Sequence, residues 1–371
     1  MKKKYLMLLC VCFTAFVSGC NQKAQVSSTD IYIPVLGDEA WLTADGSFMN
    51  GVDMAIEELN QKYKDTGYHV RTSIVDDKAI YETGVEMATK LSMDEAVTAV
   101  FCLQNFDVSK TTAGILSESD KLTLFPYGAY DSIFQRDNSY LFCGVPAFAN
   151  LGEAMAKYAV ENNYKRIAVY HNGIQSQEEL VAAFELALIN TDSKVVDYVP
   201  QISSSSEFDD IYNRWSALGV DCVVISQYGL DEAYDVLNMI RKKDKNIAII
   251  GEPIFNRANA LEENKEAAEG MAVPSTLVME ESQKLNDFKA RYQERYQKEA
   301  DIWAVQGYDM LSLVMDTAVR LHTNNPTEIA KAIQEDGYQG VGRQIAFRKG
   351  GAMVIDVNKL PMQQCKDGRF Q

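Results

Sequence analysis

Short apolar segments alternate with amphipathic patterns through the first part of the chain. The apolar segments are rich in β-forming residues, and they predict strands at residues 30–37, 68–77, 96–103 and 121–128. Between them, apolar side chains recur at helical spacing, as in Val52, Ala55, Ile56 and Leu59. This spacing predicts helices over 48–60, up to about 91, and over 108–119.

The same alternation starts again after residue 145. It predicts strands at residues 165–171, 194–200, 220–226 and 246–252, with a helical pattern between each pair. Strand–helix–strand units at this spacing require right-handed crossovers and therefore build parallel sheets. We expect an α/β fold with two doubly wound parallel-sheet lobes, one from each set of strands.

The last third of the chain has a different pattern. Residues 281–321 are almost entirely helical in their spacing, and a further helix is predicted after Pro326, because proline suits the first turn of a helix. Residues 342–357 predict a hairpin that turns at Gly350 and Gly351. Ligands of open parallel sheets bind beyond the carboxyl ends of the strands, so two facing lobes predict a binding cleft between them.

The first nineteen residues form a separate pattern. Lys2, Lys3 and Lys4 precede an uncharged run from Tyr5 to Val17, which is too short to span a bilayer and is typical of a secretory signal peptide. The run ends at Ser18-Gly19-Cys20, which resembles the lipobox of bacterial lipoproteins. That resemblance implies cleavage before Cys20 and attachment of a lipid to it, with residues 20–29 as a flexible tether. The alternative is an ordinary signal peptide that contains Cys20 by chance.

The net charge of the chain excludes some classes of binding partner. The chain of 371 residues has 52 acidic and 36 basic side chains, and removal of the first nineteen residues would take three lysines and no acid, which gives a formal charge of −19. A strongly acidic protein lacks the basic face that nucleic acids require, so no nucleic-acid partner is expected.

The sequence contains none of the common catalytic or metal-binding motifs. Its three histidines lie in different predicted elements, and no cysteine pair has CxxC spacing. Cys102, Cys143, Cys222 and Cys365 are either free thiols or disulfide partners. Asp76-Asp77 is either a carboxylate pair that binds a metal or a helix cap. We expect no metal, no cofactor and no enzymatic activity.

Several segments, in order and spacing, resemble the type I periplasmic binding proteins, and specifically the branched-chain amino acid receptors of ABC transporters. The segments are "IYIPVLG", "GSFMNGVDMAIEELN", "VDD", "KRIAVYHNGIQSQE", "GVDCVVIS", "EAAEGMAV" and "WAVQGYD". The resemblance implies two lobes joined by a hinge of three strands, as in a Venus flytrap. It places 30–145 and 275–340 in lobe 1, and 146–274 and 341–371 in lobe 2.

The resemblance also implies a set of ligand-binding residues, several of which depart from the family pattern. The family's carboxylate-binding serine is replaced in the stretch Leu103-Gln104-Asn105, and its Pro-Ala-Ser-Thr loop by Pro126-Tyr127-Gly128-Ala129. Ser176 replaces a tyrosine, while Tyr228 is retained. Glu252, displaced by one position, corresponds to the ammonium-binding glutamate and otherwise caps a helix. Trp41 either faces the ligand or packs within its loop.

The resemblances to the receptor family and to the lipobox together imply an extracytoplasmic solute-binding lipoprotein. It would capture a small polar ligand by closing its lobes and deliver it to the permease subunits of an ABC transporter. An amino acid is the first choice of ligand, and a polar amide, a short peptide fragment or an aromatic acid are alternatives. The lipid would hold the protein to the outer side of the cytoplasmic membrane or within the periplasm. The alternative function is a ligand sensor coupled to a membrane signalling receptor.

Overall fold

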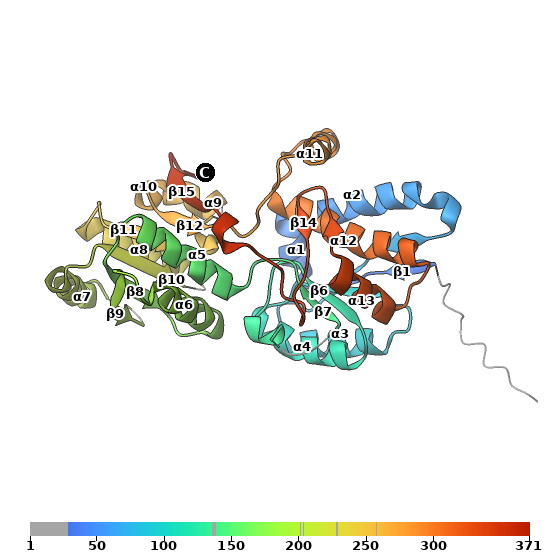
Figure 1. The fold of residues 1–371 in the computed structure, drawn as a ribbon, viewed down its shortest axis with the longest axis horizontal. Coiled ribbons are helices and arrows are strands. Elements are labelled where there is room, and N and C mark those ends of the chain that lie inside the picture. Colours follow the sequence, from blue (N-terminus) through green and yellow to red (C-terminus); the bar gives the residue numbers. More distant parts are fainter. Residues whose placement is uncertain (1–28, 136–138, 201, 203, 228, 257) are drawn as a thin grey trace, which may run out of the picture.

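The computed structural model describes residues 29–371 except 136–138, 201, 203, 228 and 257. The expected signal peptide (1–19), nearly all of the expected tether (20–29) and Cys20 lie outside the described residues, as does Tyr228. Two lobes lie side by side along the long axis of the molecule (Figure 1). Among the described residues, no helix combines the length and apolar character needed to cross a membrane.

Lobe 1 is built on a parallel sheet of five strands in the order β4-β2-β5-β6-β7. Its first part contains β1 (Asp30–Tyr32), β2 (Val35–Gly37), α1 (Glu39–Asp45), α2 (Ser47–Lys62), β3 (His69–Arg71), β4 (Ile74–Asp76), α3 (Tyr81–Met93), β5 (Ala99–Cys102), α4 (Phe106–Glu118), β6 (Leu122–Phe125), the short 3₁₀ turn η2 (Asp131–Ile133) and β7 (Leu141–Cys143). The chain later returns to add α11 (Gln283–Tyr296), α12 (Ile302–Leu321), α13 (Pro326–Asp336), β13 (Tyr338–Gln339) and β14 (Gln344–Ile345).

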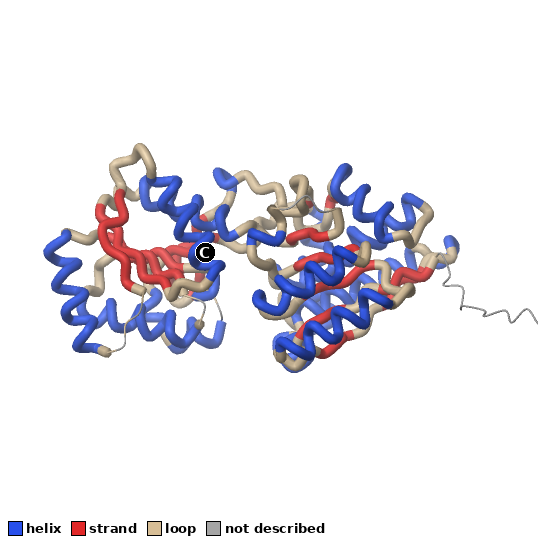
Figure 2. Tube along the Cα trace, turned by 90° about the horizontal axis from the view of Figure 1, so that it is seen from below, coloured by secondary structure: helices blue, strands red, loops and turns tan. Residues whose placement is uncertain are grey.

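Lobe 2 is built on a sheet in the order β16-β15-β12-β11-β10-β8-β9, which is parallel from β12 to β9. Its elements are α5 (Phe148–Glu161), β8 (Arg166–His171), α6 (Gln175–Leu188), β9 (Lys194–Val199), α7 (Ser205–Leu218), β10 (Cys222–Ser226), α8 (Leu230–Lys243), β11 (Ala248–Gly251), α9 (Ala258–Glu263), α10 (Lys265–Ala268), β12 (Ala272–Pro274), β15 (Met362–Lys366) and β16 (Arg369–Phe370). In both lobes helices pack on both sides of the strands (Figure 2). The doubly wound α/β fold predicted from the sequence is thereby confirmed.

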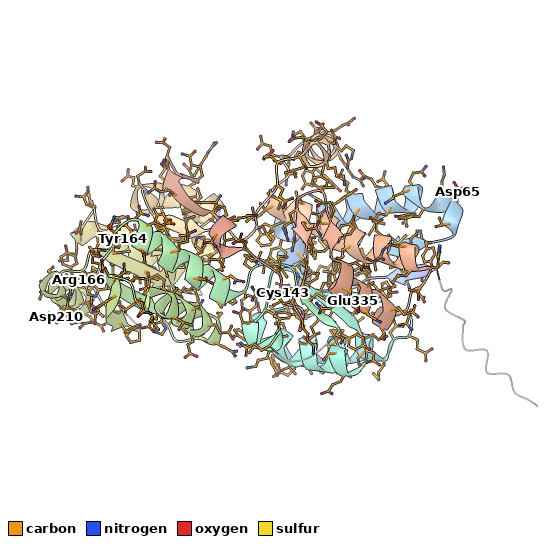
Figure 3. All side chains as sticks on the ribbon, viewed as in Figure 1. Asp65, Cys143, Tyr164, Arg166, Asp210 and Glu335 are labelled. Atoms are coloured by element: carbon orange, nitrogen blue, oxygen red, sulfur yellow. The ribbon has the colours of Figure 1, made fainter. Side chains whose placement is uncertain are left out.

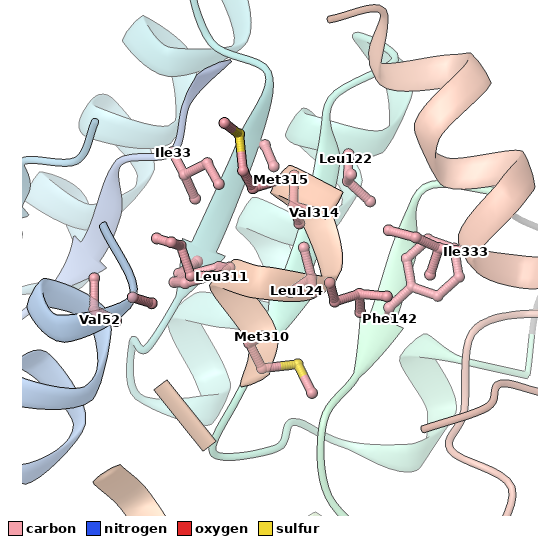
Figure 4. Packing of buried hydrophobic residues seen from close by; sticks show 14 of the residues in the cluster. Ile33, Val52, Leu122, Leu124, Phe142, Met310, Leu311, Val314, Met315 and Ile333 are labelled. Atoms are coloured by element: carbon pink, nitrogen blue, oxygen red, sulfur yellow. The ribbon is translucent and has the colours of Figure 1, made fainter. Parts of the chain in front are cut away.

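The core of lobe 1 depends on the returning helix α12. Met310, Leu311, Val314 and Met315 are fully buried on it and pack in one cluster with side chains of α2 and the sheet, such as Val52 (Figure 4). Residues far apart in sequence therefore complete one hydrophobic core. This is why α12 belongs to lobe 1 although lobe 2 precedes it in the chain.

The chain passes between the lobes three times. The first passage follows β7, the second follows β12 and reaches Leu277 in a lobe 1 cluster, and the third runs from Ile355, beside the lobe 1 core, to Val357 and Leu360 in lobe 2. Cys143, at the end of β7, lies where the lobes meet (Figure 3). None of the three passages is itself a regular strand over its described residues, so the expected three-strand hinge consists of three irregular connections.

The boundary expected at residue 341 lies too early. The predicted hairpin exists, because Phe347 pairs antiparallel with Met353, but Ile345, Phe347 and Met353 are buried in the core of lobe 1 rather than lobe 2. Phe347 packs edge-to-face on Phe142 at 4.9 Å between ring centroids. The hairpin is apolar enough to fill either core, and the sequence pattern carried no information on which one it enters.

The four cysteines in the described part of the chain, Cys102, Cys143, Cys222 and Cys365, are buried and free. Burial raises the pKa of the Cys102 and Cys143 thiols to about 12. These side chains therefore serve as small apolar groups rather than as reactive thiolates.

Candidate ligand-binding cleft

A cleft of about 1650 Å³ lies between the two lobes and is lined by both. Lobe 1 contributes α1, the loops that follow β4, β5 and β6, and the start of α12. Lobe 2 contributes the start of α6 and the loops that follow β10, β11 and β12. The carboxyl ends of both parallel sheets therefore face one space, as the rule for open α/β sheets requires.

The described candidate residues all lie along this interlobe cleft. From lobe 1 these are Trp41, Gln104, Asn105, Tyr127, Gly128 and Ala129, and from lobe 2 they are Ser176 and Glu252. Tyr228 lies outside the described residues. Their roles as ligand contacts stay predictions.

The side-chain amide of Gln104 is not free to donate a hydrogen bond to a ligand. Its Nε2 donates to Asp77 Oδ2 at 2.9 Å, and its Oε1 accepts from Thr112 Oγ1 at 2.8 Å. The side chain is buried and its amide is already hydrogen-bonded at both ends, so it holds the loops after β4 and β5 together. Asn105 is the exposed member of the pair, and its side chain does not cap α4, which begins at the next residue.

The adjacent Asp76 and Asp77 accept hydrogen bonds from backbone N–H groups, but neither caps α3, the helix that follows them, whose N-cap is Ile80. Asp76 Oδ1 accepts from the backbone N–H of Glu39, in the first turn of α1, at 3.1 Å and from that of Lys78 at 2.9 Å. These donors lower the pKa of Asp76. Asp77 Oδ1 accepts from the Ala79 N–H at 2.9 Å. Among the described residues, no group of three or more acidic, histidine or cysteine side chains lies close enough together to hold a metal ion.

Glu252 follows β11 and forms the centre of a buried polar cluster on the lobe 2 side. Only 5% of the residue is exposed. Its carboxyl group accepts a hydrogen bond from Ser226 Oγ, at the end of β10, and longer ones of 3.3 and 3.4 Å from Gln177 Nε2. Ser176 Oγ in turn donates to Gln177 Oε1 at 2.8 Å.

The electrostatic state of Glu252 follows from this burial. Desolvation raises its pKa to about 7, and the hydrogen bonds from Ser226 and Gln177 offset part of that rise. No charged side chain among the described residues contributes to the shift, and His171, opposite Ser226 in the register of β8 and β10, is not a source of it. Among the described residues, which do not include Arg257, Glu252 is therefore a buried carboxyl group without a counter-ion, beside a cleft. That is a costly arrangement unless a cation arrives.

Aromatic side chains line the lobe 1 side of the cleft. Tyr127 stacks on Trp303 with ring centroids 4.0 Å apart and meets Trp41 edge-to-face at 5.2 Å. We call Trp41, Tyr127 and Trp303 the aromatic wall. Trp41 stays 43% exposed although it packs on Tyr127, so it belongs both to the loop packing and to the cleft surface.

The lobes are also joined by two carboxylates beside the first passage. Asp131 of lobe 1 accepts from the backbone N–H groups of Phe148 and Ala149, both at 2.9 Å, in the first turn of α5. Glu179 of lobe 2 accepts from the N–H of Asp131 at 2.9 Å. The residue before α5, Ala147, has no side chain able to cap it. A carboxylate from the other lobe therefore supplies the cap.

Replacing Asp131 with asparagine should change how stability depends on pH. Burial and the nearby Glu179 raise the pKa of Asp131 from 3.8 to about 6, against the lowering by the Phe148 and Ala149 N–H groups. The folded protein therefore keeps this proton at pH values where the unfolded chain has lost it. The stability that the group contributes falls by about 3 kcal/mol as the pH rises from about 4 to above 6.

Denaturant unfolding of the wild type and of Asp131→Asn at both ends of this pH range measures the effect. The free energy of unfolding of the wild type should fall relative to that of the variant as the pH rises. Parallel stability profiles for the two proteins would show that Asp131 does not titrate in the folded state.

Sequence reasoning missed several residues of the site. Ser226 is the polar carboxyl end of a predicted strand, and Gln177 follows Ser176 directly, so both positions carried a signal. Trp303 lies in the first turn of α12, inside the quoted segment "WAVQGYD". Asp131 and Glu179 carried no local signal, because their partners lie in the other lobe.

The fold and the cleft together define a two-lobed α/β protein with a ligand-binding site between its lobes. The family model described as "Periplasmic binding protein" matches residues 31–369, so the chain belongs to the periplasmic binding protein family. This confirms the resemblance found in the sequence. A search of curated proteins finds no match.

Solved structures show the same fold at low sequence identity. An ABC transporter substrate-binding protein from Desulfitobacterium hafniense, in complex with Leu, has a TM-score of 0.82 and 21% identity over 92% of this chain and 99% of that one. LivJ from Streptococcus pneumoniae, with isoleucine, has a TM-score of 0.75 and 19% identity over 93% and 98% of the two chains. A solute-binding protein from R. palustris, with benzoate, has a TM-score of 0.73 and 16% identity over 93% and 95%.

Proposed function

We propose that the protein captures a small organic solute in the interlobe cleft and releases it chemically unchanged. The observation that carries this proposal is Glu252, a buried carboxyl group at the edge of a cleft lined by both lobes, which has no counter-ion among the described side chains. A ligand that touches both lobes favours the closed arrangement, because only that arrangement makes both sets of contacts. No step in this cycle makes or breaks a covalent bond.

The solute would then pass to the permease subunits of an ABC transporter. The proteins of this fold from Desulfitobacterium hafniense and R. palustris support that destination, since their own names place them with ABC transporters. Lipid attachment at Cys20 would keep the protein in the cell envelope, on the outer side of the cytoplasmic membrane or in the periplasm. The mass of the mature protein tests this part of the proposal: cleavage before Cys20 and a diacylglycerol adduct support it, and a mature chain without lipid contradicts it.

Mass spectrometry of small molecules released when the purified protein is denatured tests capture itself. The compound found should raise the melting temperature when it is added back, because a ligand that binds only the folded state stabilises it. Its mass should be the same after prolonged incubation with the protein. A compound that is converted to a product would contradict the proposal.

Binding of a ligand with a protonated amino group should depend on pH through Glu252. Because burial raises the pKa of Glu252 to about 7, the free protein holds a proton there in mildly acidic solution, and a cation must displace it. Affinity should therefore rise about tenfold per pH unit up to about pH 7 and level off above it. Calorimetry at about pH 6 in buffers of different ionisation enthalpy should show release of about one proton per ligand. Affinity that is flat over this range would place the cation elsewhere.

A further inference from the structure

The side chains that line the interlobe cleft are strongly biased toward negative charge. Among the lining residues that the structure describes, the acidic ones are Asp38, Asp77, Glu252, Glu263 and Asp301. The basic lining residue is Lys289. Across the whole chain the ratio is much lower, with 52 acidic and 36 basic residues, so the described part of the cleft lining is richer in acid than the chain as a whole. Carboxylates in a cleft with low-dielectric walls attract cations and repel anions.

Lys289 is poorly placed to balance these charges. It lies on α11, which stands at the periphery of lobe 1 (Figure 1), and its side chain is 43% exposed. Its Nζ lies 3.9 Å from a carboxylate oxygen of Glu281. A solvated lysine with an acidic neighbour contributes little to holding an anion.

Two groups on the lobe 1 side that could hold a ligand carboxylate are engaged or unsuitable, which leaves the exposed Asn105 as the side-chain amide there. The Gln104 amide is hydrogen-bonded to Asp77 and Thr112. The first turn of α4, which lies beside the cleft, carries Asp107, whose Oδ1 accepts from Tyr130 OH at 2.6 Å. An acidic side chain in the first turn already interacts with the positive end of the helix and opposes a second anion there.

The aromatic wall complements a cation rather than an anion. The faces of tyrosine and tryptophan rings carry partial negative charge and attract ammonium groups. Trp41, Tyr127 and Trp303 also offer an apolar surface to the rest of the ligand. The wall belongs to lobe 1 and Glu252 to lobe 2, so one ligand would contact both when the lobes close.

We propose that the captured solute carries a net positive charge, as an organic amine without a free carboxylate, and that its apolar or aromatic body contacts the aromatic wall. This inference rests on the proposed function, because it names the class of solute that the cleft would capture. A receptor for a zwitterionic amino acid differs, because it needs hydrogen-bond donors for the carboxylate of its ligand.

Two matched ligand series test the charge directly on the wild-type protein. One series is phenethylamine, phenylalanine and 3-phenylpropanoate, and the other is isoamylamine, leucine and 4-methylpentanoate. Each series keeps the apolar body and changes the net charge from positive through neutral to negative. Binding is measured by calorimetry and by thermal shift at about pH 8, where Glu252, with its pKa of about 7, is ionised before any ligand arrives.

The amine of at least one series should bind at least about tenfold more tightly than its zwitterion, and the acid should give no shift in melting temperature. Raising the salt concentration should weaken amine binding. A zwitterion or an acid that binds as tightly as its amine, or two amines that both fail to bind, would overturn the inference. Binding of the zwitterion alone would leave the proposed solute capture standing. The proposed function fails instead if no member of either series binds and no small molecule is released from the purified protein.

Discussion

Replacing Glu252 with glutamine is expected to lower the affinity for the best-binding amine of these series by at least about 30-fold, or ~2 kcal/mol. Glutamine has nearly the same shape and keeps an acceptor for Ser226 Oγ, so the cluster around it should stay folded. What the variant loses is the negative charge opposite the bound cation. In a buried position that loss is large, because no other charged side chain among the described residues acts on this group. Calorimetry at about pH 8 measures the change with Glu252 ionised.

Glu263→Gln is the matched control for this experiment. Glu263 also lines the cleft, but it is exposed, and charges in contact with water contribute little to binding. The affinity of the Glu263→Gln variant for the same amine should stay within about threefold of that of the wild type. Equal losses in the two variants would mean that the cleft attracts cations only through its overall charge, and that Glu252 makes no direct contact.

Replacing Gly152 with alanine is expected to destabilise lobe 2 by about 2–3 kcal/mol and to lower its melting temperature by about 5–10 °C. Gly152 lies on α5 where α5 and α6 pack closely in the core of the lobe. A Cβ atom at this position would lie 2.1 Å from the Leu180 carbonyl oxygen and 3.0 Å from the Phe184 amide nitrogen. Both contacts are with the backbone of α6, so the two helices have to separate.

Gly114→Ala is the control for helix propensity. Gly114 lies inside α4, and a Cβ there would have no atom within 4 Å apart from its chain neighbours and the backbone of its own helix. Alanine should therefore stabilise the protein by about 0.5–1 kcal/mol, because it restricts the unfolded chain and favours the helix. Thermal unfolding of both variants compares the two effects. If Gly152→Ala is as stable as the wild type, α5 and α6 do not approach as closely as the structure shows.

The positions of most strands and helices could be predicted, because each lobe repeats one simple pattern. The division of the expected strands into shorter ones could not be predicted. The single strand expected over 30–37 is two strands, β1 and β2, because Pro34 has no amide hydrogen and interrupts the ladder between them. β1 pairs with β3, whereas β2 pairs with β4 and β5, so the expected strand at 68–77 is divided in the same way.

The site was predictable at the level of loops and much less at the level of side chains. Residues after parallel strands were expected to meet in a cleft, and eight candidates do line it. The orientation of Gln104 depends on Gly84 of α3, since a Cβ at that position would lie 2.4 Å from Gln104 Nε2. The sequence alone contains no signal that relates Gly84 to the side-chain amide of Gln104. The contacts of Asp131 and Glu179 depend in the same way on how the lobes meet.

Small-angle X-ray scattering of the wild-type protein, with and without the compound released from it, tests the central claim most directly. If the lobes close around the solute, the radius of gyration should fall on binding and recover when the compound is removed by dialysis, and the dialysed compound should have its original mass. A radius of gyration that stays constant at saturation, or a compound recovered in altered form, would contradict reversible capture between the two lobes.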